Sequence, residues 1–250
     1  MAPKQPGHEI HLSIVAPARD EAENLPRFVE EVRNAMDQLE TTWELIVVDD
    51  GSSDTTKRVL RELFAKTPRL RVIAFSESAG KSAAWQAGFR AARGAFIATI
   101  DADLQNDPRD IIAMLHALNC RQCDMINGMR SNRNDPWLRL ISSRIANGVR
   151  NCLTGERITD SACGLKVFRW ECVVDLRLFE GLHRFLPTLV KMQGFTVAEI
   201  SISHRPRSAG SAKYGVQNRL FKGLKDALVV RWMKRNAPRY RAQEWERPDG

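Results

Sequence analysis

The sequence lacks any long apolar run. No stretch approaches the roughly 18 consecutive apolar residues that a membrane-spanning helix needs. The opening MAPKQPGHEIHL also lacks the apolar centre of a secretory signal peptide. From these two absences we expect a protein of the cytoplasm.

Cysteine is sparse, with five residues in the chain of 250. An odd count in a chain without a signal peptide argues against a disulfide framework. Cys120 and Cys123 form a single C-x-x-C, and a zinc site would need a second pair, which the sequence does not contain. We therefore expect reduced thiols near the end of a helix.

Aromatic residues are also few, at 7%, and the tryptophans are scattered, so the sequence has no aromatic ladder for nucleic acid. Internal repeats and low-complexity segments are absent as well. These absences exclude a repeat protein and lead us to expect no nucleic-acid partner.

What the sequence does contain is a composition typical of a globular protein, with 43% hydrophobic and 27% charged residues. Its net charge of +8 is concentrated at one end, because residues 205–250 hold twelve Lys and Arg against four acids. The remainder of the chain is therefore neutral in sum. Such a local excess predicts an anionic surface or ligand at the C-terminal end.

Apolar spacing predicts an alternation of strands and helices as far as about residue 130. Strands are predicted over 11–17, 43–50, 69–75, 95–100 and 124–129. Helices are predicted over 24–39, 51–67, 81–94, the last ended by Gly94, and 108–119. Short links between these elements indicate an α/β fold with a mainly parallel sheet buried between helices.

Two aspartates, Asp101 and Asp103, directly follow the apolar segment AFIATI. Ligands bind beyond the carboxyl ends of strands in such sheets, and residues i and i+2 of extended backbone point the same way. Gln105 follows at the same spacing if the extension continues. A hard divalent cation would separate the two charges and would also accept oxygen ligands from a bound phosphate. The alternatives are an acid–base pair or helix caps, and Asn106 and Asp107 are better placed as caps.

A second candidate for ligand binding is the start of the predicted helix over 81–94. Gly80 and Lys81 stand there, and backbone N–H groups with a lysine suit a phosphate. The G-x-x-x-x-G-K pattern of a Walker loop is absent, and the alternative is a solvated lysine at the start of a helix.

Several motifs in order resemble those of family-2 glycosyltransferases. They are IVAPARDEAENL, ELIVVDDGSSDTT, SAGKSAAWQAGF, IDADLQNDP and TDSACGLKVF. The ending HRPRSAGSAKYG is similar to the subgroup with dolichol-phosphate mannosyltransferase and bacterial polyprenyl-phosphate glycosyltransferases, and the resemblance covers roughly residues 10 to 235. It implies the GT-A fold, a GDP- or UDP-sugar donor and Mg²⁺ or Mn²⁺.

The resemblance also implies roles for individual residues of the donor site. It places Pro17, Ala18 and Glu21 at the nucleotide pocket. It gives Asp49 or Asp50 a hydrogen bond from the base, although Asp50 could instead cap the turn DGSSD. The metal ligands that it implies are Asp101, Asp103 and Gln105, with Gly80 and Lys81 near the phosphates.

At the acceptor side, the resemblance assigns the loop after the predicted strand 124–129 to a phosphate, through Arg130 and Arg133. Asp160 is expected near the reacting sugar, and Arg207 and Lys213 are expected as phosphate ligands. The predicted catalytic set is then Asp103, Arg130, Asp160 and Arg207.

Together these features predict an inverting transfer of a sugar from a nucleotide diphosphate to a polyprenyl phosphate. A phosphate acceptor is largely ionised at neutral pH, whereas a sugar hydroxyl would need a strong general base. The alternatives are a transferase with a sugar hydroxyl acceptor, a nucleotidyltransferase that makes nucleotide-sugars, and a non-catalytic nucleotide-binding module. The sequence has APARDEAEN where a nucleotidyltransferase would carry a glycine-rich loop.

The chain divides by prediction into a catalytic domain over 10–204 and a basic acceptor-loop and amphipathic helical segment over 205–250. The segment 216–232 carries apolar residues at i, i+4 spacing among basic ones, including Leu224, Leu228 and Trp232. Such a helix can lie in the interface of an anionic membrane, here at its cytoplasmic face. Equally, it can be an ordinary helix that covers the core.

Overall fold

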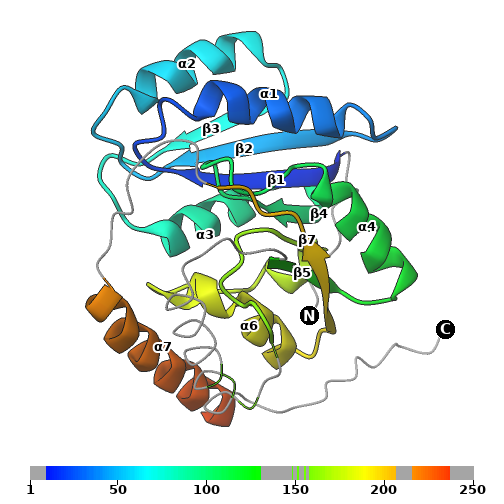
Figure 1. Ribbon diagram of the computed structural model, residues 1–250, viewed down its shortest axis with the longest axis vertical. Helices are drawn as coiled ribbons and strands as arrows, with labels where there is room; N and C mark the ends of the chain where they lie inside the picture. Colours follow the sequence, from blue (N-terminus) through cyan, green and yellow to red (C-terminus); the bar gives the residue numbers. More distant parts are fainter. Residues whose placement is uncertain are drawn as a thin grey trace, which may run out of the picture.

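A seven-stranded sheet forms the centre of the molecule in the computed structural model (Figure 1). The structure describes residues 10–130, 148, 151, 155, 158–206 and 216–236, with side chains from Gly223 onward in the last segment. The strands are β1 Ile10–Ala18, β2 Trp43–Asp49, β3 Leu70–Ala74, β4 Gly94–Thr99, β5 Met125–Arg130, β6 Lys166–Arg169 and β7 Val197–Ile202. Their order in the sheet is β3-β2-β1-β4-β6-β5-β7.

The sheet is mainly parallel, as predicted. β1 pairs in parallel with β2 and β4, β2 with β3, and β5 with β7. β6 alone runs the other way, between β4 and β5. Sequence analysis assigned no strand to 166–169, because four residues are too short for a periodic pattern. This strand brings the segment before it to the carboxyl end of β4.

Helices cover both faces of the sheet. They are α1 Leu25–Met36, α2 Thr56–Lys66, α3 Lys81–Ala91, α4 Asp110–Cys120, α6 Leu186–Met192 and α7 Val216–Asn236, with short 3₁₀ turns η1 Trp170–Cys172 and η2 Leu182–Phe185. The prediction that Gly94 ends a helix was wrong, since α3 stops at Ala91 and Gly94 begins β4. A side chain at Gly94 would collide with the backbone of β1, which explains the glycine.

Alternating strand residues divide the core into two layers. Leu12, Ile14 and Ala16 of β1 pack with α1, α2 and α4 on one face of the sheet. Val15, from the same strand, packs with α3, α6 and α7 on the other. The period of two along β1 therefore sets which helices lie on which side, as Figure 1 shows for α1 and α3.

The cysteine prediction is confirmed for the described residues, where Cys120, Cys123, Cys163 and Cys172 are all free thiols. Cys120 is the last residue of α4. Among the helices of the described part, none is long and apolar enough to span a bilayer.

Candidate active site

The two predicted metal-binding aspartates lie at the carboxyl end of β4, in a turn rather than in extended strand. β4 ends at Thr99, and Leu104 adopts a left-handed conformation with φ +62°. The buried side chains of Ala102 and Leu104 draw this turn into the core. The extended backbone on which the predicted alignment of Asp101 and Asp103 depended ends before them, and the condition for Gln105 to follow is not met. The Gln105 backbone N–H instead donates to Asp103 Oδ1 at 3.3 Å.

Asp101 is surrounded by cations. Lys81 Nζ, from the first turn of α3, lies 2.6 Å from Asp101 Oδ1. Burial raises the pKa of Asp101, but the charge and hydrogen bond of Lys81, together with the charge of Lys166, outweigh it and leave this pKa below its usual range. On the other side, any side chain at Gly164 would collide with the Asp101 carboxylate. Asp101 is thus an ionised carboxylate in a fitted position.

The donor set at this turn suits a hard divalent cation. Asp101 and Asp103 supply carboxylate oxygens, and Gln105 offers an amide oxygen nearby in the chain. Within the described ranges, no group of three or more His, Cys, Asp or Glu side chains gathers in a way that could hold a metal. Two carboxylates, with the rest of the shell from water and substrate phosphate, are the usual arrangement for Mg²⁺.

The two aspartates at the end of β2 have separate structural tasks. Asp49 Oδ1 accepts from Ser52 N, so Asp49, rather than Asp50, holds the turn after the strand. Asp50 accepts from the backbone N–H groups of Ala79 and Gly80, at 2.7 and 2.9 Å, and fixes the loop that leads into α3. Asp49 Oδ2 is buried and has no hydrogen-bond partner in the part of the chain that the structure describes.

The other residues predicted for the nucleotide pocket lie beside these aspartates. Pro17 and Ala18 end β1, where they pair with Val48 and Asp49 of β2. Glu21 shapes the loop that follows: its carboxylate accepts from Asn24 Nδ2 at 2.6 Å, and its backbone N–H donates to Thr56 Oγ1 at 2.9 Å. The structure thus brings these residues to the same sheet edge as Asp101.

Arg130 and Asp160 form a two-pronged ion pair. Arg130 Nε lies 2.7 Å from Asp160 Oδ2, and Arg130 Nη2 donates to Asp160 Oδ1 at 2.9 Å. Glu199 of β7 lies beside this pair: its carboxylate accepts from the backbone N–H of Thr159 at 2.9 Å and from the side-chain Nδ2 of Asn127 at 2.9 Å. The predicted acceptor arginine and the predicted sugar-side aspartate are therefore direct partners.

Two further groups lie beside Asp101 that sequence analysis did not assign to the site. Lys166 is fully buried, and burial lowers its pKa to about 8. His183 Nδ1 bonds to Ser82 Oγ at 2.8 Å, with the His183 ring edge-on to Trp85. Burial, and then the charges of Lys81 and Arg184, lower the His183 pKa to about 3, so this imidazole is neutral. Spacing could not reveal either group, because only the fold brings them to Lys81.

Arg205 holds the turn that follows β4, over residues 100–107, from its outer side. Its guanidinium reaches Glu31 of α1 at 2.6 Å and Asp107 at 2.5 Å, and its backbone N–H donates to Gln105 O at 2.8 Å. Burial raises the pKa of Asp107, but hydrogen bonds from Arg109 and Arg205 bring it down to about 2. The remaining predicted phosphate ligands, Arg133, Arg207 and Lys213, lie outside the described residues.

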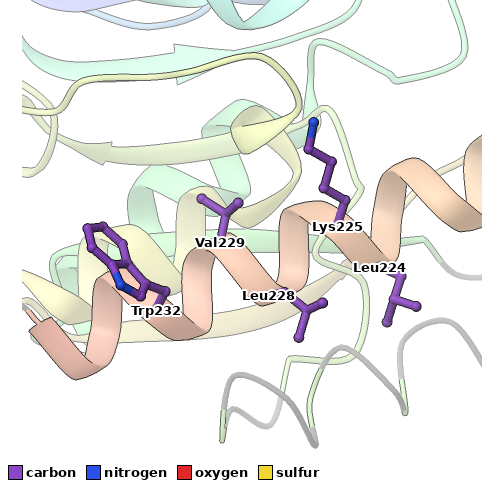
Figure 2. A pocket seen from close by; sticks show the side chains of 5 residues that line it. All are labelled: Leu224, Lys225, Leu228, Val229 and Trp232. Atoms are coloured by element: carbon purple, nitrogen blue, oxygen red, sulfur yellow. The ribbon is translucent and has the colours of Figure 1, made fainter.

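The helix α7 is apolar on two sides. Ala227 and Val230 are buried in the core layer that also holds α3. On the other side lie exposed apolar residues, which line a shallow groove of about 490 Å³ with Lys225 (Figure 2): Leu224, Leu228, Val229 and Trp232. Trp232 is 66% exposed. The buried side fits the prediction of a helix that covers the core, and contact of the exposed side with a membrane stays a prediction.

A family model described as Glycosyl transferase family 2 matches residues 13–173. That range contains the sheet edge with Asp49, Asp101 and Asp160. The chain belongs to glycosyl transferase family 2. The predicted family, and with it the prediction of a glycosyltransferase, is confirmed.

Two curated proteins similar to this chain are named as polyprenyl-phosphate sugar transferases. A dodecaprenyl-phosphate galacturonate synthase from Rhizobium johnstonii is 38% identical over 92% of this chain and 69% of its own length. An undecaprenyl-phosphate 4-deoxy-4-formamido-L-arabinose transferase from Aeromonas hydrophila is 31% identical over 83% of this chain. The chain spans 64% of that second relative, so somewhat under two thirds of its length.

Solved structures confirm the GT-A fold. A glucosyl-3-phosphoglycerate synthase from Mycobacterium tuberculosis, with Mn²⁺, UDP and phosphoglyceric acid, aligns with a TM-score of 0.65 and 18% identity over 92% of this chain and 80% of its own. The mannosyltransferase PcManGT from Pyrobaculum calidifontis, with GDP-mannose and Mn²⁺, aligns with a TM-score of 0.61 and 17% identity over 92% of this chain and 75% of its own.

Proposed function

We propose that this glycosyltransferase moves a sugar from a nucleotide diphosphate to the phosphate of a polyprenyl phosphate, with inversion at the sugar carbon. The observation that carries the proposal is the 38% identity, over 92% of the chain, with a protein named dodecaprenyl-phosphate galacturonate synthase. The charges of the site support it. Asp101 is held ionised, and Asp160 is paired with Arg130. A phosphate acceptor needs no protonated acid and no strong general base.

The donor occupies the sheet edge formed by β1, β2 and β4. Of the two aspartates after β2, Asp49 is the better candidate to accept a hydrogen bond from the base, because its Oδ2 is buried without a partner among the described residues. Lys81, which pairs with Asp101, and N–H groups in the first turn of α3 would bind the diphosphate, whereas the Gly80 N–H itself donates to Asp50. Pro17, Ala18 and Glu21 line the nucleotide side.

Asp101 and Asp103 would hold Mg²⁺ or Mn²⁺, with Gln105 as a further oxygen donor, and the ion would neutralise the diphosphate as it leaves. The protein's own part is to keep the Asp101 carboxylate ionised and to hold the turn that carries both aspartates. Lys81 and the close packing of Gly164 do this for Asp101. Arg205 does it for the turn as a whole through Gln105 O.

The acceptor phosphate is oriented by cations of the acceptor side. Arg130 binds Asp160 through Nε and Nη2, and we assign its third guanidinium nitrogen, Nη1, to the acceptor phosphate. Arg133, Arg207 and Lys213 complete the proposed phosphate site on the grounds of their motifs. In this arrangement Asp160 sets the direction of Arg130 and lies near the reacting sugar.

Attachment to the membrane surface belongs to the same proposal, because the acceptor is a lipid. The exposed apolar residues of α7 and the net +8 charge of residues 205–250 suit an anionic leaflet. We place the enzyme peripherally at the cytoplasmic face, with a catalytic domain over 10–204 and a membrane- and acceptor-binding segment over 205–250.

The test is a panel of nucleotide-sugars, UDP-galacturonate included, offered with four acceptors, with products identified by mass spectrometry. The acceptors are a polyprenyl phosphate, the same polyprenol without phosphate, a free sugar, and a sugar 1-phosphate with nucleoside triphosphate. We expect product only with the polyprenyl phosphate. Transfer to the free sugar, or nucleotide-sugar made from sugar 1-phosphate, would replace this proposal with one of the alternatives.

A further inference from the structure

Lys166 is the fully buried cation of the site, and its partners are backbone carbonyls. It lies at the start of β6, opposite Thr99 of β4. Its ammonium donates to Cys163 O, and to Ser161 O at 3.3 Å. Within the described ranges no carboxylate forms an ion pair with it. A charge buried in this way is costly unless a specific structure requires it.

The segment that Lys166 gathers, residues 160–165, carries two contacts of the candidate active site. At its start, Asp160 forms the two-pronged pair with Arg130. Near its end, Gly164 packs against the Asp101 carboxylate, and Gly164 O accepts from Thr99 Oγ1 at 2.8 Å. The shape of one short turn therefore decides where both carboxylates stand.

The ammonium of Lys166 can set that shape because it reaches two carbonyls from inside the turn. An apolar side chain of equal length would fill the same volume but leave the carbonyls of Ser161 and Cys163 without this donor in the core. Each unsatisfied buried carbonyl would then favour a different turn conformation. The positive charge also lies within electrostatic reach of Asp101 and Asp160.

We propose that Lys166 is a positioning residue for the transfer reaction: its buried ammonium holds turn 160–165 in the conformation that seats Asp101 against Gly164 and Asp160 against Arg130. This inference rests on the proposed function for its kinetic part. Its structural part, the dependence of the turn on Lys166, can be measured without any substrate.

The test compares Lys166→Met with Lys166→Gln and with Val167→Ala. Met has the length of lysine without a donor, and Gln keeps an N–H donor without the charge. Val167 is the next residue of β6, is fully buried, and faces the opposite core layer. Val167→Ala therefore lowers stability without touching the turn carbonyls.

We expect Lys166→Met to lower kcat at least tenfold while the donor KM changes less than threefold, and to speed amide hydrogen exchange of residues 160–165 at least tenfold. Lys166→Gln should recover part of both effects, and Val167→Ala should change neither beyond threefold. The inference would be overturned if residues 160–165 exchanged as slowly in Lys166→Met as in the wild type. If Lys166→Met folds poorly, Lys166→Gln takes its place, and wild-type exchange rates in that variant would overturn the inference as well. If the wild type uses no polyprenyl phosphate, the exchange result still decides the structural part.

Discussion

Asp101 interacts with the cations Lys81 and Lys166 of the site. Its carboxylate is paired with Lys81 and packed against Gly164. A bound divalent ion would take over part of the neutralisation of Asp101 that Lys81 now provides. The metal hypothesis is therefore best tested at this residue and its neighbour Asp103.

Removal of metal should stop the reaction. We expect EDTA to abolish sugar transfer, Mg²⁺ or Mn²⁺ to restore it, and Asp103→Ala to lose nearly all activity, because the leaving diphosphate then lacks charge compensation. Asp101→Asn should also weaken Mn²⁺ binding at least tenfold in a titration with UDP or GDP present. The control is Asp37→Asn, an exposed carboxylate at the end of α1. Full turnover in excess chelator would contradict the metal assignment.

His183 should make folding stability depend on acid pH. Its pKa is about 3 in the folded protein and 6.5 in the unfolded chain. Between those values the unfolded state binds the extra proton, so the free energy of unfolding should fall by up to about 1.4 kcal/mol per pH unit as the pH drops from 6.5. Urea unfolding between pH 6.5 and 4.5 measures this slope. His183→Asn, which keeps a partner for Ser82, should flatten the slope; an unchanged slope would show that other groups cause it.

Arg207 should act on the acceptor and not on the donor. One charge-assisted contact to a phosphate is worth roughly 1.5–3 kcal/mol, so Arg207→Ala should lower kcat/KM for a short polyprenyl phosphate by about one to two powers of ten. Nucleotide-sugar binding, measured by calorimetry, should stay within twofold. Asp160→Asn is the contrast, with a lower rate and near-normal donor affinity. An equal loss of donor binding in Arg207→Ala would move this residue to the diphosphate site.

At the scale of elements, η2 lies between α7 and the start of α3 and contacts both. Arg184 lies 2.6 Å from Asp226 of α7, and its neighbour His183 bonds to Ser82 of α3. Gly181, with φ +83°, lets the backbone pass close to the Asp226 carboxylate. A mostly buried ion pair therefore adds to the apolar packing of Ala227 and Val230 in holding α7 on the core.

Breaking that pair should loosen α7. Asp226→Asn leaves Arg184 without its counter-ion, and we expect a loss of about 1–3 kcal/mol in urea unfolding, with faster hydrogen exchange confined to α7 and η2. The matched control is Glu62→Gln, which removes an exposed pair with Arg58 within α2 and should cost under about 0.5 kcal/mol. Equal costs for the two variants would mean that the Arg184–Asp226 pair does not anchor the helix.

At the scale of the whole molecule, charge and apolar surface coincide at one end. We expect sedimentation with anionic vesicles at low salt and release at high salt, since exposed charges are screened beyond about 8 Å at physiological ionic strength. Burying one apolar side chain contributes about 1.5–3 kcal/mol, so Trp232→Asp or Leu228→Asp should weaken binding roughly tenfold. Phe64→Asp is the control, because Phe64 is 57% exposed on α2. Equal binding to neutral and anionic vesicles would remove the electrostatic part.

The sequence by itself determined the strands, helices and parallel sheet as far as residue 130, because periodicity and short links are local properties. It also determined the family, since several motifs stand in order, and it marked Asp49, Asp50, Asp101 and Asp103 as strand-end carboxylates. The sequence could not assign β6, because a four-residue strand that pairs antiparallel between β4 and β5 is fixed only by its neighbours.

Only the tertiary structure decided which charges meet. The pair Arg130–Asp160 spans 30 residues, and the contact of His183 with Ser82 spans 101. Burial of Lys166 and the two-sided packing of α7 also depend on elements far apart in the chain. Side-chain partners across such distances follow from the packing of layers against the sheet, which no local spacing contains. For that reason the sequence identified the kind of site, and the fold supplied its electrostatics.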